Sequence, residues 1–173
     1  MSLPVGVKVT PLTTHRDDRG TFTELFRRSW MPEVGLIQWN GVNSEARVLR
    51  GVHVHIKHDD LLTVLRGRGI FGLRDIRRGS PTEGMTAMVE LSAAEHRTLF
   101  IPHGVAHGFY FPEPSLHVYA VSEYFDMADE LGCRFDDPDL GLDWPDREPK
   151  ISARDRGLPT LKSIVPRVPA YGA

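Results

Sequence analysis

Apolar and polar residues alternate along many short stretches of this chain, with the period of two that half-buried β-strands produce. Turn-forming residues separate these stretches at intervals of about 8–12 residues, a spacing typical of an antiparallel sandwich or barrel. The expected strands cover residues 5–10, 22–26, 34–40, 47–56, 61–66, 69–76, 85–91, 97–101, 105–111 and 116–124. Residues 17–20 and 67–69 are expected to form tight turns between strands.

Helical periodicity is weak throughout, although residues 126–131 could form a single helical turn. From about residue 136 the chain is rich in Pro, Asp and Arg. We expect this irregular C-terminal tail to pack over the strands rather than to form a second domain. The pattern therefore predicts an all-β fold, a jelly roll with short helical turns, built as one domain over residues 1–173.

Composition narrows the possible classes of protein and partner. With 173 residues, 40% of them hydrophobic, the chain is long enough for one domain with a substantial core. A net charge of −2 gives no electrostatic reason to expect nucleic acid or an anionic membrane as a partner. Apolar stretches are far shorter than the roughly 20 residues that span a bilayer. The N-terminus has no basic-then-apolar signal pattern, and the single cysteine, Cys133, excludes an intrachain disulfide, so we expect a cytoplasmic protein in which Cys133 is a bystander.

Two histidine clusters carry the candidate chemistry. The first is a His-x-His run at His53 and His55, whose side chains point to the same face of a strand; the second is a Pro-x-Gly-x-x-His run that ends at His107. Together with Asp60, where a Glu is more usual, this spacing resembles that of the cupins, which are small jelly rolls. The four side chains, His53, His55, Asp60 and His107, suit Mn, Fe, Ni, Cu or Zn. The alternative, on spacing alone, is a set of hydrogen-bonded polar groups in a cavity.

A second resemblance rests on motifs that follow one another in order along nearly the whole chain. They are Asp18–Glu24, Gln38-x-Asn40, Val48–His53, Asp75–Thr82, Leu91–Ala93, Ile101–Phe109, Asp136–Pro145 and Ile151–Asp155. In these motifs the chain resembles the dTDP-4-dehydrorhamnose 3,5-epimerase family. The resemblance implies a cupin-type double-stranded β-helix.

The family's reaction removes protons from C3 and C5, next to the C4 ketone of a sugar nucleotide, and returns them on the opposite face. That chemistry needs a base, an acid on the other face, and a positive group beside the enolate oxygen. By resemblance, His53 is the base, Asp155 is the carboxylate that orients it, and Tyr119 is the acid. Without the resemblance, Tyr119 would be interpreted as an aromatic residue of the core or rim.

Six further residues match positions that hold the nucleotide diphosphate and the sugar in this family: Arg19, Glu24, Gln38, Asn40, Arg50 and His107. Arginine suits phosphate because its planar guanidinium pairs with two oxygens at once. Taken alone, Arg19 and Glu24 would be interpreted as solvated surface charges.

One position departs from the family. Asp60 stands where the family has the lysine that stabilises the enolate oxygen, and His55 stands where it usually has a glutamine. An aspartate there would repel the developing anion. Lys57 or His58 could substitute if the short loop folds inward, or the four possible metal ligands could hold a Lewis-acid cation. The metal interpretation competes with the acid–base one for His53, because a bound metal would occupy its lone pair.

We therefore predict an epimerase that acts on a 4-keto-6-deoxy sugar nucleotide, at C3, C5 or both, in deoxysugar or surface polysaccharide synthesis. The expected partner is a nucleotide-diphosphate sugar, no cofactor is expected, and the resemblance implies a homodimer whose partner residues help to shape each site. Two alternatives are a metal-dependent cupin isomerase or oxygenase with one divalent transition metal, and a cupin that binds a sugar nucleotide without catalysis.

Overall fold

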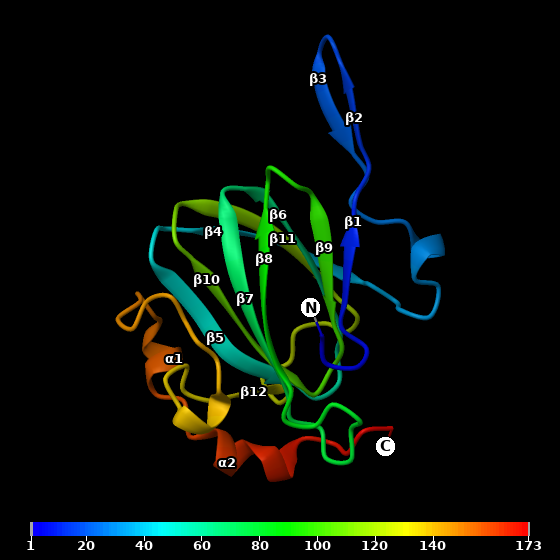
Figure 1. Ribbon diagram of the computed structural model, residues 1–173. Helices are drawn as coiled ribbons and strands as arrows, with labels where there is room; N and C mark the ends of the chain where they lie inside the picture. The colour runs from blue at the N-terminus through cyan, green and yellow to red at the C-terminus, as the bar shows by residue number, and fades with distance from the viewer. Residues whose placement is uncertain (1, 173) are drawn as a thin grey trace.

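The computed structural model describes residues 2–172 and is built around two five-stranded sheets (Figure 1). In the first sheet the order is β1 (Lys8–Pro11), β9 (Arg97–Ile101), β6 (Asp60–Arg66), β11 (Ser115–Val121) and β4 (Gln38–Ser44). In the second it is β12 (Glu130–Gly132), β5 (Val48–His55), β10 (Val105–Phe111), β7 (Arg68–Asp75) and β8 (Thr86–Ser92). The pairings within both sheets are antiparallel, and the predicted all-β jelly roll is confirmed.

The remaining elements lie outside the two sheets. Strands β2 (Thr14–Asp17) and β3 (Gly20–Thr23) form a hairpin that projects away from the body of the molecule (Figure 1). Short helical segments are η1 (Arg28–Trp30), η2 (Pro138–Leu140), α1 (Ala153–Arg156), α2 (Leu161–Ile164) and η3 (Val165–Arg167). Within residues 2–172, none of the helices is long and apolar enough to cross a membrane.

The core between the sheets is made of apolar side chains at alternating strand positions. Leu62 and Val64 of β6 point inward, as do Phe71 and Leu73 of β7, and all four are almost fully buried. The same alternation brings polar side chains of β5, β6, β10 and β11 to one region of the interior, where a cavity forms.

The C-terminal tail covers the outer face of the second sheet, as predicted. Val52 and Val54 of β5, whose side chains point away from the cavity, pack with Trp144, Leu161 and other apolar residues of the tail. Cys133 belongs to this cluster and is fully buried, and burial raises the pKa of its thiol to about 12. This environment agrees with the interpretation of Cys133 as a bystander.

Most strand predictions were right in position, but strand β2 was missed and several limits differ. The predicted strand 5–10 is β1 at Lys8–Pro11, and the predicted strand 22–26 is β3 at Gly20–Thr23. The predicted strand 34–40 begins only at residue 38, because Val34 packs in a small cluster with Leu61 and Phe100 instead. The predicted strand 116–124 ends at Val121. The predicted helical turn at 126–131 is wrong, because Glu130–Gly132 forms strand β12 and pairs with β5.

One of the family motifs, Asp75–Thr82, builds a turn rather than the cavity. The Asp75 carboxylate is fully buried and accepts hydrogen bonds from Arg77, Ser80 and Thr82. Burial opposes its ionisation, but these hydrogen bonds outweigh that effect and lower the pKa of Asp75 to about 2. The motif therefore stabilises the connection between β7 and β8.

Candidate active site

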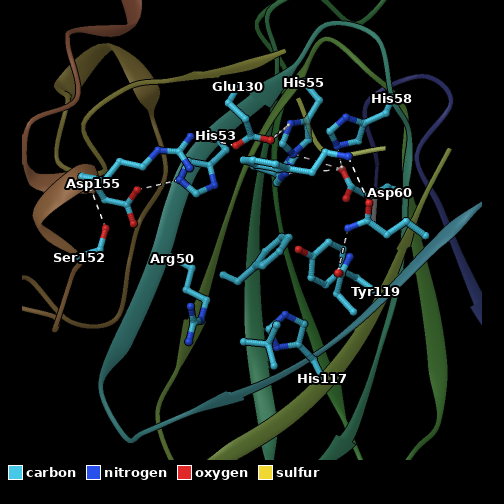
Figure 2. A pocket seen from close by; sticks show the side chains of 18 residues that line it. Arg50, His53, His55, His58, Asp60, His117, Tyr119, Glu130, Ser152 and Asp155 are labelled. Carbon is cyan, nitrogen blue, oxygen red and sulfur yellow. Dashed lines mark hydrogen bonds and ion pairs between the residues drawn. The ribbon is translucent and has the colours of Figure 1, made fainter. Parts of the chain in front are cut away.

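A cavity of about 290 Å³ opens among side chains from both sheets and from the C-terminal tail (Figure 2). Its polar lining residues are Gln38, Asn40, Arg50, His53, His55, His58, Asp60, His107, His117, Tyr119, Glu130, Ser152, Arg154 and Asp155. Five histidines and three carboxylates in so small a space are unusual for a structural core, where ionisable groups are rare. The cavity therefore identifies the candidate site.

Strand β5 supplies three of these residues because its pairing with β10 is irregular. His53 lies opposite His107, but Arg50 lies opposite Phe109, so β5 has one more residue than β10 over this stretch. The irregularity turns Arg50 and His53 toward the same cavity. Gly51 makes it possible: its φ is +112°, and a Cβ there would lie 2.9 Å from the backbone oxygen of His107.

His53 and Asp155, which are far apart in sequence, form a hydrogen-bonded pair at one side of the cavity (Figure 2). His53 Nε2 lies 2.8 Å from Asp155 Oδ1. Asp155 is held in place by its own helix, because Ser152 caps α1 by accepting from the Asp155 N–H, and by Gly51, whose N–H lies 3.4 Å from Asp155 Oδ2. Burial opposes ionisation of Asp155, but the hydrogen bond from His53 outweighs it and lowers the pKa of the carboxyl.

This pairing fixes which nitrogen of His53 can act as a base. The ionised carboxylate can only accept, so His53 Nε2 carries the proton and the lone pair of the neutral ring is on Nδ1. The geometry that the sequence predicted for these two residues is therefore present.

Tyr119 lines the cavity from strand β11, where it pairs with Asn40 of β4 and Leu62 of β6. Burial, followed by the nearby charges of Asp60 and Glu130, raises the pKa of its hydroxyl. The hydroxyl is therefore protonated near neutral pH and can give a proton to an anion in the cavity.

The floor of the cavity holds a second group, formed by His55, His58, Asp60, His107 and Glu130, separate from the His53–Asp155 pair (Figure 2). Burial lowers the pKa values of His55 and His107, and burial together with the neighbouring carboxylates raises the pKa of Asp60 well above its ordinary value. Glu130 lies 3.1 Å from His55 Nδ1 and accepts a hydrogen bond from Arg154, and these two contacts outweigh its burial and lower its pKa to about 2.

The predicted substrate-binding residues divide into two sets. Gln38, Asn40 and Arg50 line the cavity, and His107 lies in its floor. Arg19 and Glu24 are outside it: Arg19, in the β2–β3 hairpin, pairs with Asp17, and Glu24, just after the hairpin, pairs with Arg27. The monomer therefore does not bring all six residues together.

Sequence reasoning left the replacement for the family lysine open between Lys57 and His58. Lys57 is exposed and lies 3.6 Å from Asp126, whereas His58 turns into the cavity. Asp129 causes this turn, because its carboxylate accepts from the backbone N–H groups of Ile56 and Lys57 and bonds to His58 Nδ1 at 2.6 Å.

Four cavity residues were not found from the sequence: His117, Glu130, Ser152 and Arg154. For Ser152 and Arg154 a signal existed, since they flank Asp155 in the Ile151–Asp155 motif and the serine precedes a short helix as a cap would. Glu130 was missed because its segment was interpreted as helical.

Comparisons with known proteins agree with the motifs. The family model described as dTDP-4-dehydrorhamnose 3,5-epimerase matches residues 3–163. The spore coat polysaccharide biosynthesis protein SpsL of Bacillus subtilis is 34% identical over 145 residues, which are 80% of this chain and 95% of that protein.

Two solved structures with bound nucleotide sugars have the same fold. The dTDP-6-deoxy-D-glucose-3,5-epimerase of Legionella pneumophila, in complex with dTDP-4-keto-L-rhamnose, has a TM-score of 0.90 at 32% identity over 96% of this chain and 94% of that one. A 3'-monoepimerase of Streptomyces bikiniensis, in complex with dTDP-quinovose, has a TM-score of 0.88 at 30% identity over 97% and 91%. The predicted resemblance is confirmed, and this chain belongs to the dTDP-4-dehydrorhamnose 3,5-epimerase family.

Proposed function

We propose that this protein is an epimerase that removes and returns protons at C3, C5 or both of a 4-keto-6-deoxy sugar nucleotide, in deoxysugar or surface polysaccharide synthesis. The observation that carries the proposal is the His53–Asp155 pair, joined at 2.8 Å beside a cavity that Tyr119 also lines. A hydrogen on a carbon next to a ketone is acidic enough to be removed by an oriented imidazole. Membership of the family supports the substrate class.

In the proposed reaction His53 Nδ1 takes the proton and Asp155 stabilises the imidazolium that results. The electrons move into the C4 carbonyl, which becomes an enolate. Tyr119, whose raised pKa keeps it protonated, then returns a proton to the carbon from the opposite face. In this proposal the two proton transfers themselves are carried out by side chains.

Substrate binding is assigned to residues on two sides of the molecule. Arg50 is oriented by contacts of its Nε with Ser44 Oγ at 3.0 Å and of its Nη2 with the Asn43 backbone oxygen at 3.2 Å, and it offers a cation to the diphosphate. Gln38 Nε2 donates to Asn40 Oδ1 at 3.1 Å, so the pair presents a fixed polar edge to the cavity.

In this proposal the remaining substrate-binding residues, Arg19 and Glu24, act in the cavity of a partner subunit. The β2–β3 hairpin carries Arg19 away from its own cavity, and Phe22 of the same hairpin is 63% exposed. Trp39, on the edge strand β4, is 47% exposed. Exposed aromatic side chains on a projecting hairpin and an edge strand are expected to bury against a second copy. A homodimer would then bring Arg19 and Glu24 toward the partner's cavity.

We also propose that residues 1–173 act as one catalytic domain and that the protein works in the cytoplasm, where a nucleotide-sugar substrate is available. Both stay predictions here.

The test is deuterium uptake from heavy water into a dTDP-4-keto-6-deoxy sugar, followed by NMR at C3 and C5. The unaltered protein should exchange one or both positions and invert them, and the His53→Asn variant should lose roughly 10²–10⁴-fold in rate, the usual share of a general base. His103→Asn is the matched control, because His103 is outside the cavity and pairs with Asp59. Binding of the nucleotide sugar without any exchange would refute the epimerase and favour the non-catalytic alternative.

A further inference from the structure

The Asp60 carboxylate is buried in the cavity floor without a compensating partner. Asp60 is 4% exposed, and its Oδ2 has no hydrogen-bond partner among residues 2–172. Buried polar atoms are nearly always hydrogen-bonded, and an exception points to a water, an ion or a functional constraint. The environment of this oxygen decides between these explanations.

Three imidazole nitrogens face the same oxygen. His55 Nε2 lies 3.6 Å from Asp60 Oδ2, His107 Nε2 lies 3.8 Å from it, and His58 Nε2 lies 4.0 Å from it. These separations are too long for hydrogen bonds. The shortest equals, and the other two exceed by a few tenths of an ångström, the roughly 3.3–3.6 Å between ligands that lie about 2.0–2.2 Å from a tetrahedral ion, so a small inward movement would bring the donors to coordination distance.

The outer nitrogens show where the protons are. His107 Nδ1 lies 3.0 Å from the Val105 backbone oxygen, which can only accept, so Nδ1 carries the proton and Nε2 carries the lone pair. His55 Nδ1 contacts Glu130 Oε1 at 3.1 Å but without hydrogen-bond geometry, so of these two rings only His107 has a tautomer that follows from a hydrogen bond. A ring whose second nitrogen donates to a carbonyl or a carboxylate is the usual arrangement of a metal-ligating histidine.

The inward-facing Nε2 atoms of His107 and His58 therefore carry lone pairs, since His58 Nδ1 bonds to the Asp129 carboxylate at 2.6 Å. The rings of His55 and His58 are stacked with centroids 3.8 Å apart, so both lie against the Asp60 oxygen. A cation placed between these lone pairs and the Asp60 oxygen would offset their mutual repulsion.

We propose that His55, Asp60 and His107 bind one divalent transition-metal cation in the cavity floor. Their donor atoms all lie within 4.8 Å of one another. Two imidazoles and one carboxylate suit Zn²⁺, Fe²⁺, Mn²⁺ or Co²⁺ and leave coordination positions open toward the cavity. His58 flanks this set, held by Asp129.

His53 is not one of the ligands in this arrangement. Its Nε2 bonds to Asp155, and the three ligands form a group without it. The metal and acid–base interpretations, which competed for His53 in the sequence, are therefore compatible. The cation would supply positive charge where the family has a lysine, a role that rests on the proposed function, whereas its binding does not.

The binding test uses protein purified without a metal-affinity column. Elemental analysis should find one equivalent of a transition metal per chain. After chelation, titration with Co²⁺ should give one equivalent of bound ion with the visible d–d absorption of mixed nitrogen and oxygen ligation. Failure of the chelated protein to bind Co²⁺ or Zn²⁺ stoichiometrically at micromolar concentration would overturn the site.

Variants locate the ion. Asp60→Asn and His107→Gln should each weaken Co²⁺ binding by more than the roughly 10–100-fold that loss of an outer-sphere partner causes. His103→Asn, an exposed histidine outside the cavity, should bind normally. Circular dichroism checks that each variant is folded, and the wild-type Co²⁺ spectrum tests the ligand set even if one variant does not fold. Unchanged binding in both folded ligand variants would refute the assignment.

A second measurement separates this inference from the proposed function. Proton exchange on the nucleotide sugar is followed in chelated protein before and after Zn²⁺ or Co²⁺ is returned, and a recovery of at least tenfold is expected. Metal binding without exchange under any condition would leave the site standing and refute the epimerase. Full exchange in metal-free protein would support the epimerase and refute the role of the cation.

Discussion

Replacing Asp155 with Asn tests the His53–Asp155 pair most directly, because it removes one charge and little volume. The carboxylate now serves two contacts, His53 Nε2 at 2.8 Å through Oδ1 and the Gly51 N–H at 3.4 Å through Oδ2. An asparagine has one oxygen and one NH₂ group in their place. The Gly51 N–H can only donate, whereas His53 Nε2 can donate or accept.

Both contacts are therefore satisfied in only one arrangement. The amide oxygen faces Gly51, the NH₂ group donates to His53 Nε2, and the ring proton moves to Nδ1. In that tautomer the lone pair of His53 points at the asparagine and not into the cavity. Loss of the charge alone would cost about 1–2 kcal/mol, or roughly 5–30-fold in rate. The wrong tautomer costs about 10⁴-fold when the triad aspartate of a serine protease is changed in the same way.

We therefore expect Asp155→Asn to lower the exchange rate by roughly 10³–10⁴-fold. Deuterium uptake measures the rate, and ¹⁵N NMR of the imidazole identifies the protonated nitrogen. Asp139→Asn, which changes an exposed carboxylate of η2 outside the cavity, is the control. A variant that exchanges within threefold of the unaltered protein would refute the assignment of His53 as a base oriented by Asp155.

Two further changes test the opposite wall of the cavity. Tyr119→Phe removes the acid but leaves the base. His53 should then deliver deuterium from the solvent to the same face of the sugar from which it removed the proton, and NMR should find exchange without inversion. Inversion at the normal rate would exclude Tyr119 as the acid. His117 is 1% exposed, and burial lowers its pKa to about 4 from the ordinary value of about 6.5. The unfolded imidazole therefore binds a proton first as pH falls from 6.5 to 4, and stability declines over this range by about 3 kcal/mol. Urea unfolding should show this decline on top of that from His55 and His107, whose pKa values are also lowered, and His117→Phe should lessen the total by about 3 kcal/mol. An equal decline in that variant would refute the contribution of His117.

The strands could be predicted from the sequence because each buries one face. The period of two found β9 (97–101) and β10 (105–111) with their observed limits. It failed at Glu130–Gly132, where a three-residue strand is too short to show a period and depends on pairing with β5. Val34 was included in a predicted strand because, in the sequence, a valine that packs in a small apolar cluster outside the sheets cannot be told from a valine on the buried face of a strand.

The site residues that lie in family motifs could be predicted from the sequence, whereas those whose orientation depends on a loop could not. The motifs led to His53, Tyr119 and Asp155, and the structure brings these three to one cavity. Spacing alone could not select the three proposed metal ligands. The cupin pattern includes His53 among the ligands, and it gives no information on the hydrogen bond between His53 and Asp155. The inward turn of His58 depends on the buried carboxylate of a residue 71 positions away.

Replacement of the family's lysine by Asp60 need not change the net charge beside the enolate oxygen if the floor of the cavity, with its proposed metal, is considered as one charged unit. A lysine ammonium would contribute a charge of +1 next to the enolate oxygen, whereas an aspartate alone contributes −1 and opposes the reaction. A divalent cation bound to that one carboxylate and to two neutral imidazoles restores the local sum to +1. Glu130, the other carboxylate beside His55, has its own counter-charge, because Arg154 contacts it at 2.9 Å. The chemistry that the family performs with one ammonium group would then be performed here with a metal and three protein ligands, and the His53–Asp155 pair would need no change.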